Sequence, residues 1–482
     1  TFSDNSIFSG TALAMNAMCV APGDYNNDGH LDFFILRSGW VFDLRYGTQP
    51  NSLIKNNGDG TFSDVTIEAG LYTIRPTQTG SWVDFDLDGN LDLLIGNETP
   101  SPTFTHNIEL YKNKGDGTFV DVAQEWGLAP RYNQYIKGIT TSDFNNDGLP
   151  DIYISNFMAE NVLLMNNGVN ESQQITFTDV SQSAGVTQPR YSFPTWFFDY
   201  NNDGWEDIFV ASYSEFGERG QAGEVAADFF GRSFNGDYPR IFLNQKNNTF
   251  KDVTNESGLQ KALHVMGSNY GDLDNDGYLD FYLGTGAPDF RSIVPNRMFR
   301  NNAGENFQDV TYSGGFGTIQ KGHGVSFADL DNDGDQDVYT VLGGARSGDV
   351  FQNALYQNPG NDNAWVTIQL QGTTSNRSAI GSRIKIEVEM PNGESKFIFN
   401  TVTSGGSFGC NSLQQEIGLG KATKIKNVSI NWANQENDFV DYGPVGMRQK
   451  VLMVEGQAAF KKLAYTTLAF KETDHSHHHH NH

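Results

Sequence analysis

Six copies of a short acidic motif recur along the first 340 residues of this 482-residue chain. The first copy reads Asp24-Tyr25-Asn26-Asn27-Asp28-Gly29-His30-Leu31-Asp32. Later copies begin, at intervals of 60, 59, 56, 73 and 57 residues, at Asp84, Asp143, Asp199, Asp272 and Asp329. A motif that returns at a nearly fixed distance marks a repeat architecture. The sequence therefore predicts six similar units, with an insertion in the fourth.

Each motif places carboxylate or amide oxygens at positions 1, 3, 5 and 9 and a glycine at position 6. In a tight loop alternate side chains turn inward, glycine permits the sharp reversal, and hard oxygen ligands suit calcium. We expect one calcium ion per loop, about six in all. The predicted ligands are Asp24, Asn26, Asp28 and Asp32; Asp84, Asp86, Asp88 and Asp92; Asp143, Asn145, Asp147 and Asp151; Asp199, Asn201, Asp203 and Asp207; Asp272, Asp274, Asp276 and Asp280; and Asp329, Asp331, Asp333 and Asp337.

An EF-hand loop shares the first six positions of the motif but carries a glutamate at position 12 and is flanked by helices. Here position 12 is occupied by Ile35, Ile95, Ile154, Val210, Leu283 and Thr340. Runs rich in β-branched and aromatic residues follow the motif. These loops are therefore expected to join strands.

Four segments with strand-like composition make up each unit, as the second unit shows most clearly. They are 81–84, 91–97, 108–113 and 118–122. Four short strands per period of about 60 residues are typical of one propeller blade. The sixth unit lacks the fourth segment, but Thr1-Phe2-Ser3-Asp4 repeats Thr61-Phe62-Ser63-Asp64. We predict an all-β, six-bladed propeller that the N-terminal strand closes.

These loops and their period resemble the FG-GAP, or VCBS, repeat family, whose calcium-binding propellers include the head of integrin α-subunits. The resemblance covers roughly residues 1–360 and implies calcium as the cofactor. Integrin heads have seven blades, so the count of six rests on this sequence alone.

After residue 360 the period stops and a second domain is predicted at 361–465. Segments 365–370, 383–388, 396–401 and 428–432 have the composition of strands in a small β-sandwich. The stretches 375–383 and 417–420 resemble the UnbV/ASPIC domain that follows FG-GAP propellers in the cartilage acidic protein family and its bacterial relatives. Ala433-Asn434 stands where that family usually has Pro-x-Gly. The resemblance implies no general activity for this domain.

A formal charge of -26 argues against nucleic acid or an anionic membrane surface as a partner. No apolar segment reaches the roughly 20 residues needed to span a bilayer. Because the sequence starts at Thr1, we expect a processed chain, from which an export signal or a lipid anchor has been removed. Loops of this kind are expected to need calcium at about 10⁻⁴ to 10⁻³ M, which places the protein in an extracellular, cell-surface or periplasmic setting.

Binding is the function that the sequence favours, because no HExxH, GxSxG or CxxC motif is present. We expect a secreted or cell-surface, calcium-stabilised adhesion protein that recognises a protein or glycan. The alternative is a propeller enzyme, a lyase or transferase acting on a sugar or small molecule. Its site would lie at the channel mouth, with Lys137, His264, His323 and Arg190.

The candidate binding surface comes from two long connections, one from 211 to 239 in the fourth unit and one from 286 to 296 in the fifth. They leave equivalent positions on neighbouring blades and should lie side by side. They would either pack across their own blades or contact a ligand. In the second case they form an aromatic and arginine-rich patch of Phe216, Phe229, Phe230, Arg232, Tyr238, Phe290 and Arg291.

The C-terminal tail, 466–482, is expected to be disordered and carries His475, His477, His478, His479, His480 and His482. These imidazoles would bind a transition metal or belong to a purification tag. Cys19 and Cys410, the two cysteines of the chain, would form a bridge or remain thiols.

Overall fold

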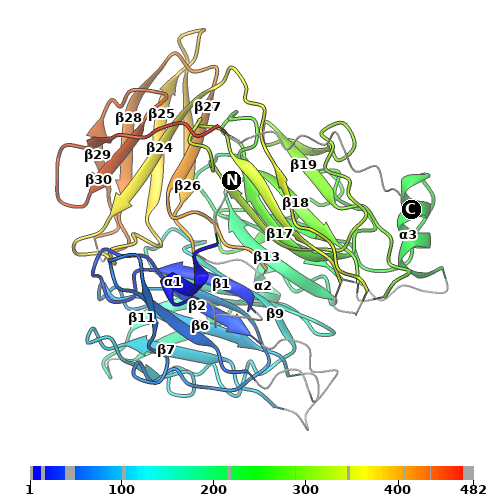
Figure 1. Cartoon of the computed structure of the whole chain (residues 1–482), viewed down its shortest axis with the longest axis horizontal. Coiled ribbons are helices and arrows are strands. Elements are labelled where there is room, and N and C mark those ends of the chain that lie inside the picture. Colours follow the sequence, from blue (N-terminus) through cyan, green and yellow to red (C-terminus); the bar gives the residue numbers. More distant parts are fainter. Residues whose placement is uncertain are drawn as a thin grey trace.

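The computed structural model describes residues 4–469 except 12–16, 38–48, 100–104, 173, 214–218, 288, 345–347, 405–407 and 435. The protein is all-β, as predicted, with three short helices among the described residues (Figure 1): α1 (Ser6–Ser9), α2 (Ser181–Ala184) and α3 (Gly220–Phe229). No helix in this part of the chain is long and apolar enough to cross a membrane.

Each repeat unit forms its own antiparallel sheet, in which consecutive strands pair with one another. Units 1 to 3 contain β1 (Ala17–Gly23), β2 (Asp32–Arg37), β3 (Ser52–Asn56) and β4 (Phe62–Asp64); β5 (Thr77–Val83), β6 (Asp92–Asn97), β7 (Glu109–Asn113) and β8 (Phe119–Asp121); and β9 (Ile136–Ser142), β10 (Asp151–Asn156), β11 (Val162–Val169) and β12 (Ile175–Asp179). Units 4 to 6 contain β13 (Ser192–Phe198), β14 (Asp207–Ser212), β15 (Arg240–Asn244) and β16 (Phe250–Asp252); β17 (Val265–Gly271), β18 (Asp280–Thr285), β19 (Arg297–Asn302) and β20 (Asn306–Asp309); and β21 (Gly322–Ala328), β22 (Asp337–Leu342) and β23 (Ala354–Tyr356). The acidic motif always joins the first strand of a unit to the second.

The sheets follow one another in chain order around a centre. First strands of successive units lie against each other, from β1 and β5 through to β17 and β21. An asparagine in or just after the third strand ties each of units 2 to 6 to the unit before it, because its Nδ2 donates to a carbonyl in the loop of that unit. These bonds, 2.7 to 3.2 Å long, run from Asn113 to Tyr25, Asn166 to Phe85, Asn244 to Phe144, Asn301 to Tyr200 and Asn358 to Leu273.

The junction between units 6 and 1 is different. Asn56, the equivalent asparagine of unit 1, donates to Leu31 of its own unit. Within the described residues the sixth sheet has three strands. Of the N-terminal segment expected to supply the fourth strand, Thr1 to Ser3 lie outside the described residues, and Asp4 precedes α1 without joining a strand. The sheets are thus not closed into a ring by the pairings seen here.

The C-terminal domain consists of two four-stranded sheets. One has the order β27-β24-β30-β31 and contains the parallel pair β24 and β30, and the other has the order β26-β25-β28-β29. The strands are β24 (Ala364–Gln371), β25 (Arg383–Glu389), β26 (Ser395–Thr401), β27 (Gln415–Gly420), β28 (Lys424–Asn431), β29 (Phe439–Gly443), β30 (Lys450–Val454) and β31 (Lys461–Leu463). β24, β25 and β26 cover the first three segments predicted from the sequence, and β28 covers the fourth except for Trp432, which follows the strand.

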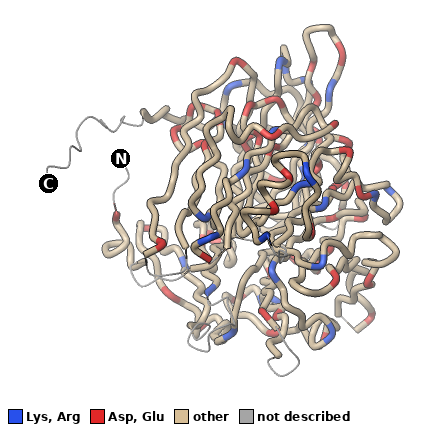
Figure 2. The backbone as a smooth tube through the Cα atoms, turned by 90° about the vertical axis from the view of Figure 1, so that its right-hand side faces the viewer, with Lys and Arg blue, Asp and Glu red and all other residues tan. Residues whose placement is uncertain are grey.

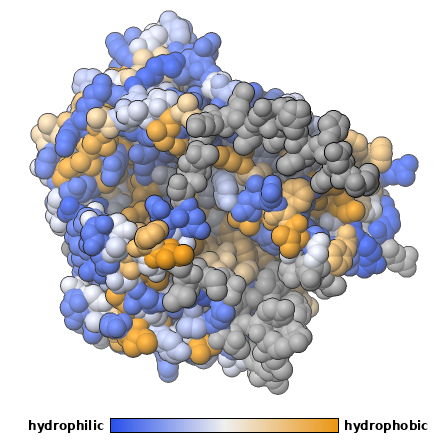
Figure 3. All heavy atoms as spheres, in the orientation of Figure 1, coloured by the Kyte–Doolittle hydropathy of each residue, from blue (hydrophilic) through white to orange (hydrophobic). Residues whose placement is uncertain are grey.

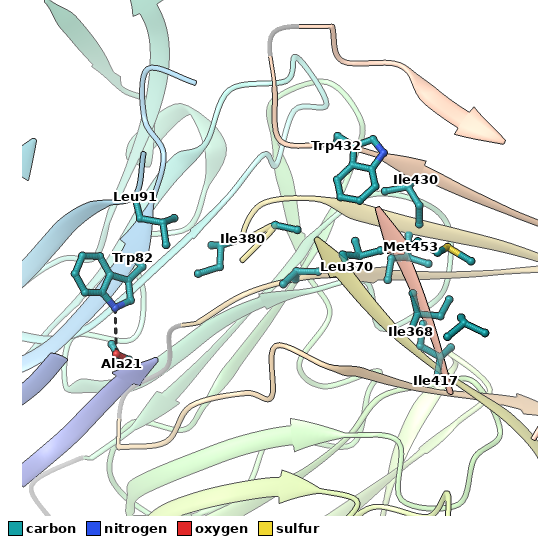
Figure 4. Close-up of a cluster of buried hydrophobic side chains, with 14 of the residues drawn as sticks. Ala21, Trp82, Leu91, Ile368, Leu370, Ile380, Ile417, Ile430, Trp432 and Met453 are labelled. Carbon is teal, nitrogen blue, oxygen red and sulfur yellow. Dashed lines mark hydrogen bonds between the residues drawn. The ribbon is translucent and has the colours of Figure 1, made fainter. Parts of the chain in front are cut away.

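One hydrophobic core runs from the C-terminal domain into units 1 and 2. Figure 4 shows Ile368, Leu370 and Ile380 of the domain in the same cluster as Trp82 and Leu91 of unit 2. The buried Trp82 ring donates its Nε1 proton to Ala21 O at 3.1 Å, which links units 1 and 2 inside this cluster. The two domains are therefore joined by shared burial as well as by the chain.

Described residues of the connection between β26 and β27 contact the first strands of several repeat units, and we call residues 402–404 and 408–414 the central segment. Ser404 Oγ accepts a hydrogen bond from Trp82 N of β5 at 3.2 Å. The buried Phe408 ring stacks on Phe193 of β13, with centroids 5.3 Å apart, and its carbonyl accepts from Val325 N of β21 at 3.0 Å. One short segment thus touches the innermost strands of three different units.

Candidate functional site

The acidic motifs form six loops of closely similar geometry. In each loop the carboxylate at position 1 accepts hydrogen bonds from the backbone N–H groups of positions 5 and 6. In the first loop Asp24 accepts from Asp28 at 3.0 Å and from Gly29 at 2.7 Å. The position-6 glycines have φ between 83° and 96°, a left-handed conformation that other residues rarely adopt. The glycine of the motif is thus required by the backbone of the loop.

The carboxylate at position 9 anchors the loop to the rest of its blade. Asp92 is buried, and its Oδ1 accepts from Asn113 N at 2.9 Å while its Oδ2 accepts from Phe85 N at 3.3 Å. Equivalent bonds from the backbone N–H of the corresponding asparagine in or just after the third strand reach Asp32, Asp151, Asp207, Asp280 and Asp337, at 2.7 to 2.8 Å. Position 9 therefore has a clear structural role, in addition to the ligand role that the sequence suggests.

Positions 1, 3 and 5 bring three carboxylates together in units 2, 5 and 6. Their candidate ligand oxygens lie within 4.8 Å of one another in the clusters Asp84, Asp86 and Asp88; Asp272, Asp274 and Asp276; and Asp329, Asp331 and Asp333. In each cluster one oxygen of the position-3 residue, on Asp86, Asp274 or Asp331, is buried without a hydrogen-bond partner. A buried carboxylate oxygen without a partner is unfavourable, and a cation between the three carboxylates would satisfy it.

Units 1, 3 and 4 have asparagine at position 3, and its amide turns toward position 5. Asn26, Asn145 and Asn201 donate Nδ2 to Asp28, Asp147 and Asp203 at 2.8 to 3.3 Å. These three loops carry one negative charge less, so the six loops form two classes with different charge.

Burial raises the pKa values of the loop carboxylates at positions 1 and 9. It raises the pKa of Asp32, Asp84 and Asp199 to about 7 and that of Asp143 to about 6, and neighbouring carboxylates add to the effect. The pKa of Asp92, Asp151, Asp207, Asp272 and Asp280 is also raised well above the usual value, with the same main cause. Figure 2 shows acidic residues in all parts of the fold. Without a bound cation, ionisation of these buried carboxylates therefore lowers the stability of the folded state.

Basic side chains lie beside several of these clusters. Lys112 contacts Asp86 and lies 3.5 Å from Asp88, and Arg300 reaches Asp274 at 2.5 Å. Lys450, from the C-terminal domain, lies 3.7 Å from Asp329. These cations offset part of the loop charge.

The C-terminal domain contacts the loops of all six units, which the sequence did not predict. Its contacts are Ser378 Oγ with Asp24 N (2.9 Å), Thr374 O close to Gly89, Arg383 with Asn146, Phe399 N with Asn202 Oδ1 (3.0 Å), Gly420 N with Asn275 O (2.8 Å) and Lys450 Nζ with Asn332 Oδ1 (2.5 Å). Trp365 lies so close to Gly334 that a Cβ there would come within 1.9 Å of the indole. Residues 466–468, predicted as the start of the tail, also hydrogen-bond to the unit 6 loop.

The residues proposed for a channel-mouth site are only partly brought together. Lys137 is buried, pairs with Glu98 and lies 5.1 Å from the centre of the Phe193 ring. His264 is buried against Tyr213, with ring centroids 3.8 Å apart. Lys137 and His264 therefore contact the same pair of packed rings, because Tyr213 also packs on Phe193.

His323 and Arg190 lie outside this group. His323 Nε2 is 2.6 Å from Gly343 O, and burial lowers the pKa of the imidazole. Arg190 is exposed, and its backbone N–H donates to Asp237. Sequence reasoning missed Glu98, because an isolated glutamate after a strand carries no motif. The ion pair neutralises Lys137, which favours a structural role for this lysine.

The two long connections do lie side by side. Val225 of α3 packs with Val294 of the unit 5 connection, and Gln221 of α3 contacts Ser292. At the end of α3, Phe229 is 61% exposed and Phe230 is 70% exposed.

Tyr312, 60% exposed, extends the aromatic surface, with its ring centroid 6.2 Å from that of Phe229. Phe290, Arg291 and Arg232 are also exposed, whereas Tyr238 is half-buried against Arg240, and Phe216 lies outside the described residues. α3 lies at the edge of the molecule, away from the C-terminal domain (Figure 1). On the face shown in Figure 3, apolar and polar residues are otherwise interspersed.

Comparisons with known proteins match both parts of the chain. The FG-GAP-like repeat family matches residues 84–154, 143–210, 223–283 and 284–340, and the family described as ASPIC and UnbV matches 372–459. Cartilage acidic protein 1 of Homo sapiens is 25% identical over 309 residues, which cover 62% of this chain and 41% of that protein. The Xenopus tropicalis protein of the same name is 30% identical over 192 residues, 37% of this chain and 27% of that protein.

This chain spans less than half the length of the curated relatives that it matches. Among solved structures, the Dos1 propeller covers 89% of this chain and is itself covered to 84%, with 11% identity and a TM-score of 0.34.

Proposed function

Because the chain belongs to the family of FG-GAP-like repeat proteins that carry an ASPIC and UnbV domain, we propose that it is a calcium-stabilised binding protein that works outside the cytoplasm. The observation that carries the metal part is the equivalent buried oxygen without a partner on Asp86, Asp274 and Asp331. Each lies in a cluster of three carboxylates, which is the donor chemistry that calcium prefers.

Each of the six loops would hold one calcium ion through its residues at positions 1, 3, 5 and 9. Bound calcium supplies positive charge that offsets the buried carboxylates. The chain itself holds the loop closed through the bonds from Gly29 and its equivalents to the position-1 carboxylate. Elemental analysis of protein purified with calcium should give about six ions per chain. Fewer than three would contradict this proposal.

The finer architecture that we propose is a six-bladed propeller of residues 1–360, closed by the N-terminal strand, with a second domain at 361–465. The turn after the missing strand supports closure. Thr11 N donates to Ser6 O, as Leu71 N donates to Thr66 O after β4. Gly10 approaches the carbonyl of Phe62 in unit 1, as Gly70 approaches that of Phe119 in unit 2. The turn at residues 6–11 therefore contacts unit 1 in the way that the turn after β4 of unit 1 contacts unit 2.

Location outside the cytoplasm follows from the calcium requirement. Loops that lack a rigid helical frame are expected to bind calcium weakly, at about 10⁻⁴ to 10⁻³ M, a concentration found outside cells. A protein with these properties would be secreted or held at a cell surface, or would lie in a periplasm.

The binding surface that we propose is the exposed aromatic surface of α3 and the neighbouring unit 5 residues, defined as Phe229, Phe230, Tyr312, Phe290 and Arg291, which we call the aromatic patch. Aromatic residues and arginine are enriched at interfaces, where an exposed ring gains contact area at low entropic cost. The calcium loops are not offered as this surface, because the C-terminal domain contacts all six of them. The partner would be a protein or a glycan.

A double variant, Phe229→Ser with Phe230→Ser, tests the aromatic patch. The parent and the variant would be compared on a printed glycan array and on an array of extracellular protein domains. We expect the variant to lose at least about tenfold in affinity for any captured probe, with an unchanged melting temperature. Ile67→Ser, at an exposed position in unit 1, is the matched control and should bind like the parent. Equal binding by the double variant would refute the assignment of the surface.

A further inference from the structure

The junction between units 6 and 1 has fewer described links than the other junctions. Within the described residues, Asn56 makes no bond to unit 6. A second kind of link is also replaced here. Asn275 Nδ2 in the unit 5 loop donates to Gly334 O of unit 6, but the equivalent Asn332 Nδ2 in the unit 6 loop donates to Thr466 O. A ring of repeat units depends on each junction, because opening one of them exposes the edges of two sheets. This junction is therefore where an additional link would contribute most.

The central segment spans this junction. On one side, Cys410 O accepts a hydrogen bond from Asn269 Nδ2 of β17 at 3.0 Å, and Phe408 O accepts one from β21. On the other side, the segment lies against Cys19 of β1, whose Sγ is 4.0 Å from Gly409 O. Units 5 and 6 are thus tied to the segment by backbone and amide hydrogen bonds, and unit 1 by a weak thiol contact.

The thiol of Cys19 lies against the peptide group that precedes Cys410. Gly409 O lies about 3 Å from the Cα of Cys410, within one planar peptide unit. Cys19 Sγ is therefore separated from Cys410 by little more than one peptide group. Disulfides join cysteines whose Cα atoms are 4.4 to about 7 Å apart, and rotation of the two side chains brings the sulfur atoms to bonding distance. Both cysteines are thiols in the structure.

We infer that Cys19 and Cys410 form a disulfide that links unit 1 covalently, through the central segment, to units 5 and 6. The bond closes a loop of 390 residues across the weakly linked junction of the ring. The N-terminal strand would link units 6 and 1 at the outer edge of unit 6, whereas the disulfide would link them at the centre of the repeat region.

The chemistry is thiol–disulfide exchange with a protein or small-molecule disulfide of an oxidising compartment. One cysteine, as the thiolate, attacks the donor disulfide, forms a mixed disulfide and releases one donor thiolate. The second cysteine then attacks the sulfur of the first and releases the other donor thiolate. The two thiol protons pass to the two donor thiolates, and the donor is reduced by two electrons. Since burial raises the pKa of both thiols, we place this exchange during folding, before the segment is enclosed.

The test uses the full chain, refolded with calcium in a buffer of reduced and oxidised glutathione and compared with the same protein kept in reductant. We expect no reactive thiol after denaturation of the oxidised sample, and a single cross-linked peptide pair that contains Cys19 and Cys410. Reduction should lower the melting temperature by roughly 5 °C or more.

Cys19→Ser with Cys410→Ser is the matched control, and its melting temperature should not respond to reductant. If the variant fails to fold, the comparison of oxidised and reduced parent still decides. Two reactive thiols after denaturation of the oxidised, folded sample would overturn the inference. A cross-link between two chains would overturn it as well, and an intramolecular link with no change in melting temperature would overturn its role in stabilising the junction.

Discussion

The loops at one end of the repeat units differ from the connections at the other end. The loops repeat almost residue for residue, bury their position-9 carboxylates and are contacted by the C-terminal domain at every unit. The connections differ in length, and two of them expose aromatic rings such as Phe230. Regularity accompanies a role in the fold, whereas irregularity marks the region where a partner could be recognised. Each of the following experiments should affect one end and spare the other.

Removal of calcium should produce the largest effect. At a free concentration of ten times Kd, each site stabilises the native state by about 1.4 kcal/mol, so about six sites give roughly 8 kcal/mol. We expect a chelator to lower the melting temperature by well over 10 °C, measured by calorimetry with and without excess calcium. Magnesium at the same concentration is the control for ionic strength and should restore little. An unchanged melting temperature in chelator would remove the distinction between the two ends.

Replacement of Phe408 by alanine should have the second largest effect. The ring is buried against Phe193 at the centre of the repeat region, and loss of a buried phenylalanine costs about 3–5 kcal/mol. Denaturant unfolding should show this loss, while binding by the aromatic patch at low temperature persists. Phe351→Ala, at a half-exposed position in unit 6, should cost less than about 1 kcal/mol. Similar values for the two variants would mean that the central segment contributes little.

The stabilisation by calcium should depend on pH. In metal-free protein, burial raises the pKa of Asp32, Asp84 and Asp199 to about 7, above the unfolded value of about 3.9. The stability that these protonated groups provide is complete below about pH 4 and is lost as pH rises through about 7. Calcium binds the ionised form, so the difference in melting temperature between calcium and chelator should grow from pH 5 to pH 8. A difference that shrinks over this range would contradict the loop assignment.

Asp86→Asn should have the smallest effect, because it gives unit 2 the position-3 residue already present in units 1, 3 and 4. The loop should keep its conformation but bind calcium more weakly, with roughly a tenfold rise in Kd at one site. Calorimetric titration would detect this change against Asp116→Asn, in an exposed turn of the same unit. If the variant failed to fold, the position-3 side chain would be required for the structure of the loop as well as for calcium binding.

The sequence predicted most of the repeat region because its determinants are local. The loop needs a glycine at φ near 90°, a carboxylate within reach of two backbone N–H groups and a strand on either side, and all of these lie within a dozen residues. The existence of two long connections was equally visible, although the helix α3 was not predicted.

The docking of the C-terminal domain could not be predicted in this way. It depends on pairs such as Arg377 with Asn27, which are 350 residues apart and unremarkable one by one. The pairing of Lys137 with Glu98 was missed for a similar reason, since only the fold brings the two buried side chains together. Such contacts depend on the relative position of whole units, which periodicity and composition do not specify.

The central segment also has a consequence for biosynthesis. It forms contacts over 322 residues with Trp82 and over 390 residues with Cys19, so the strands of units 1 and 2 receive these neighbours only after all the residues in between have been synthesised. Assembly dominated by such distant contacts is slow and leaves sheet edges exposed in the meantime. A nascent chain of this kind needs protection until its C-terminal domain is complete, and truncation after unit 6 would leave it permanently unfinished.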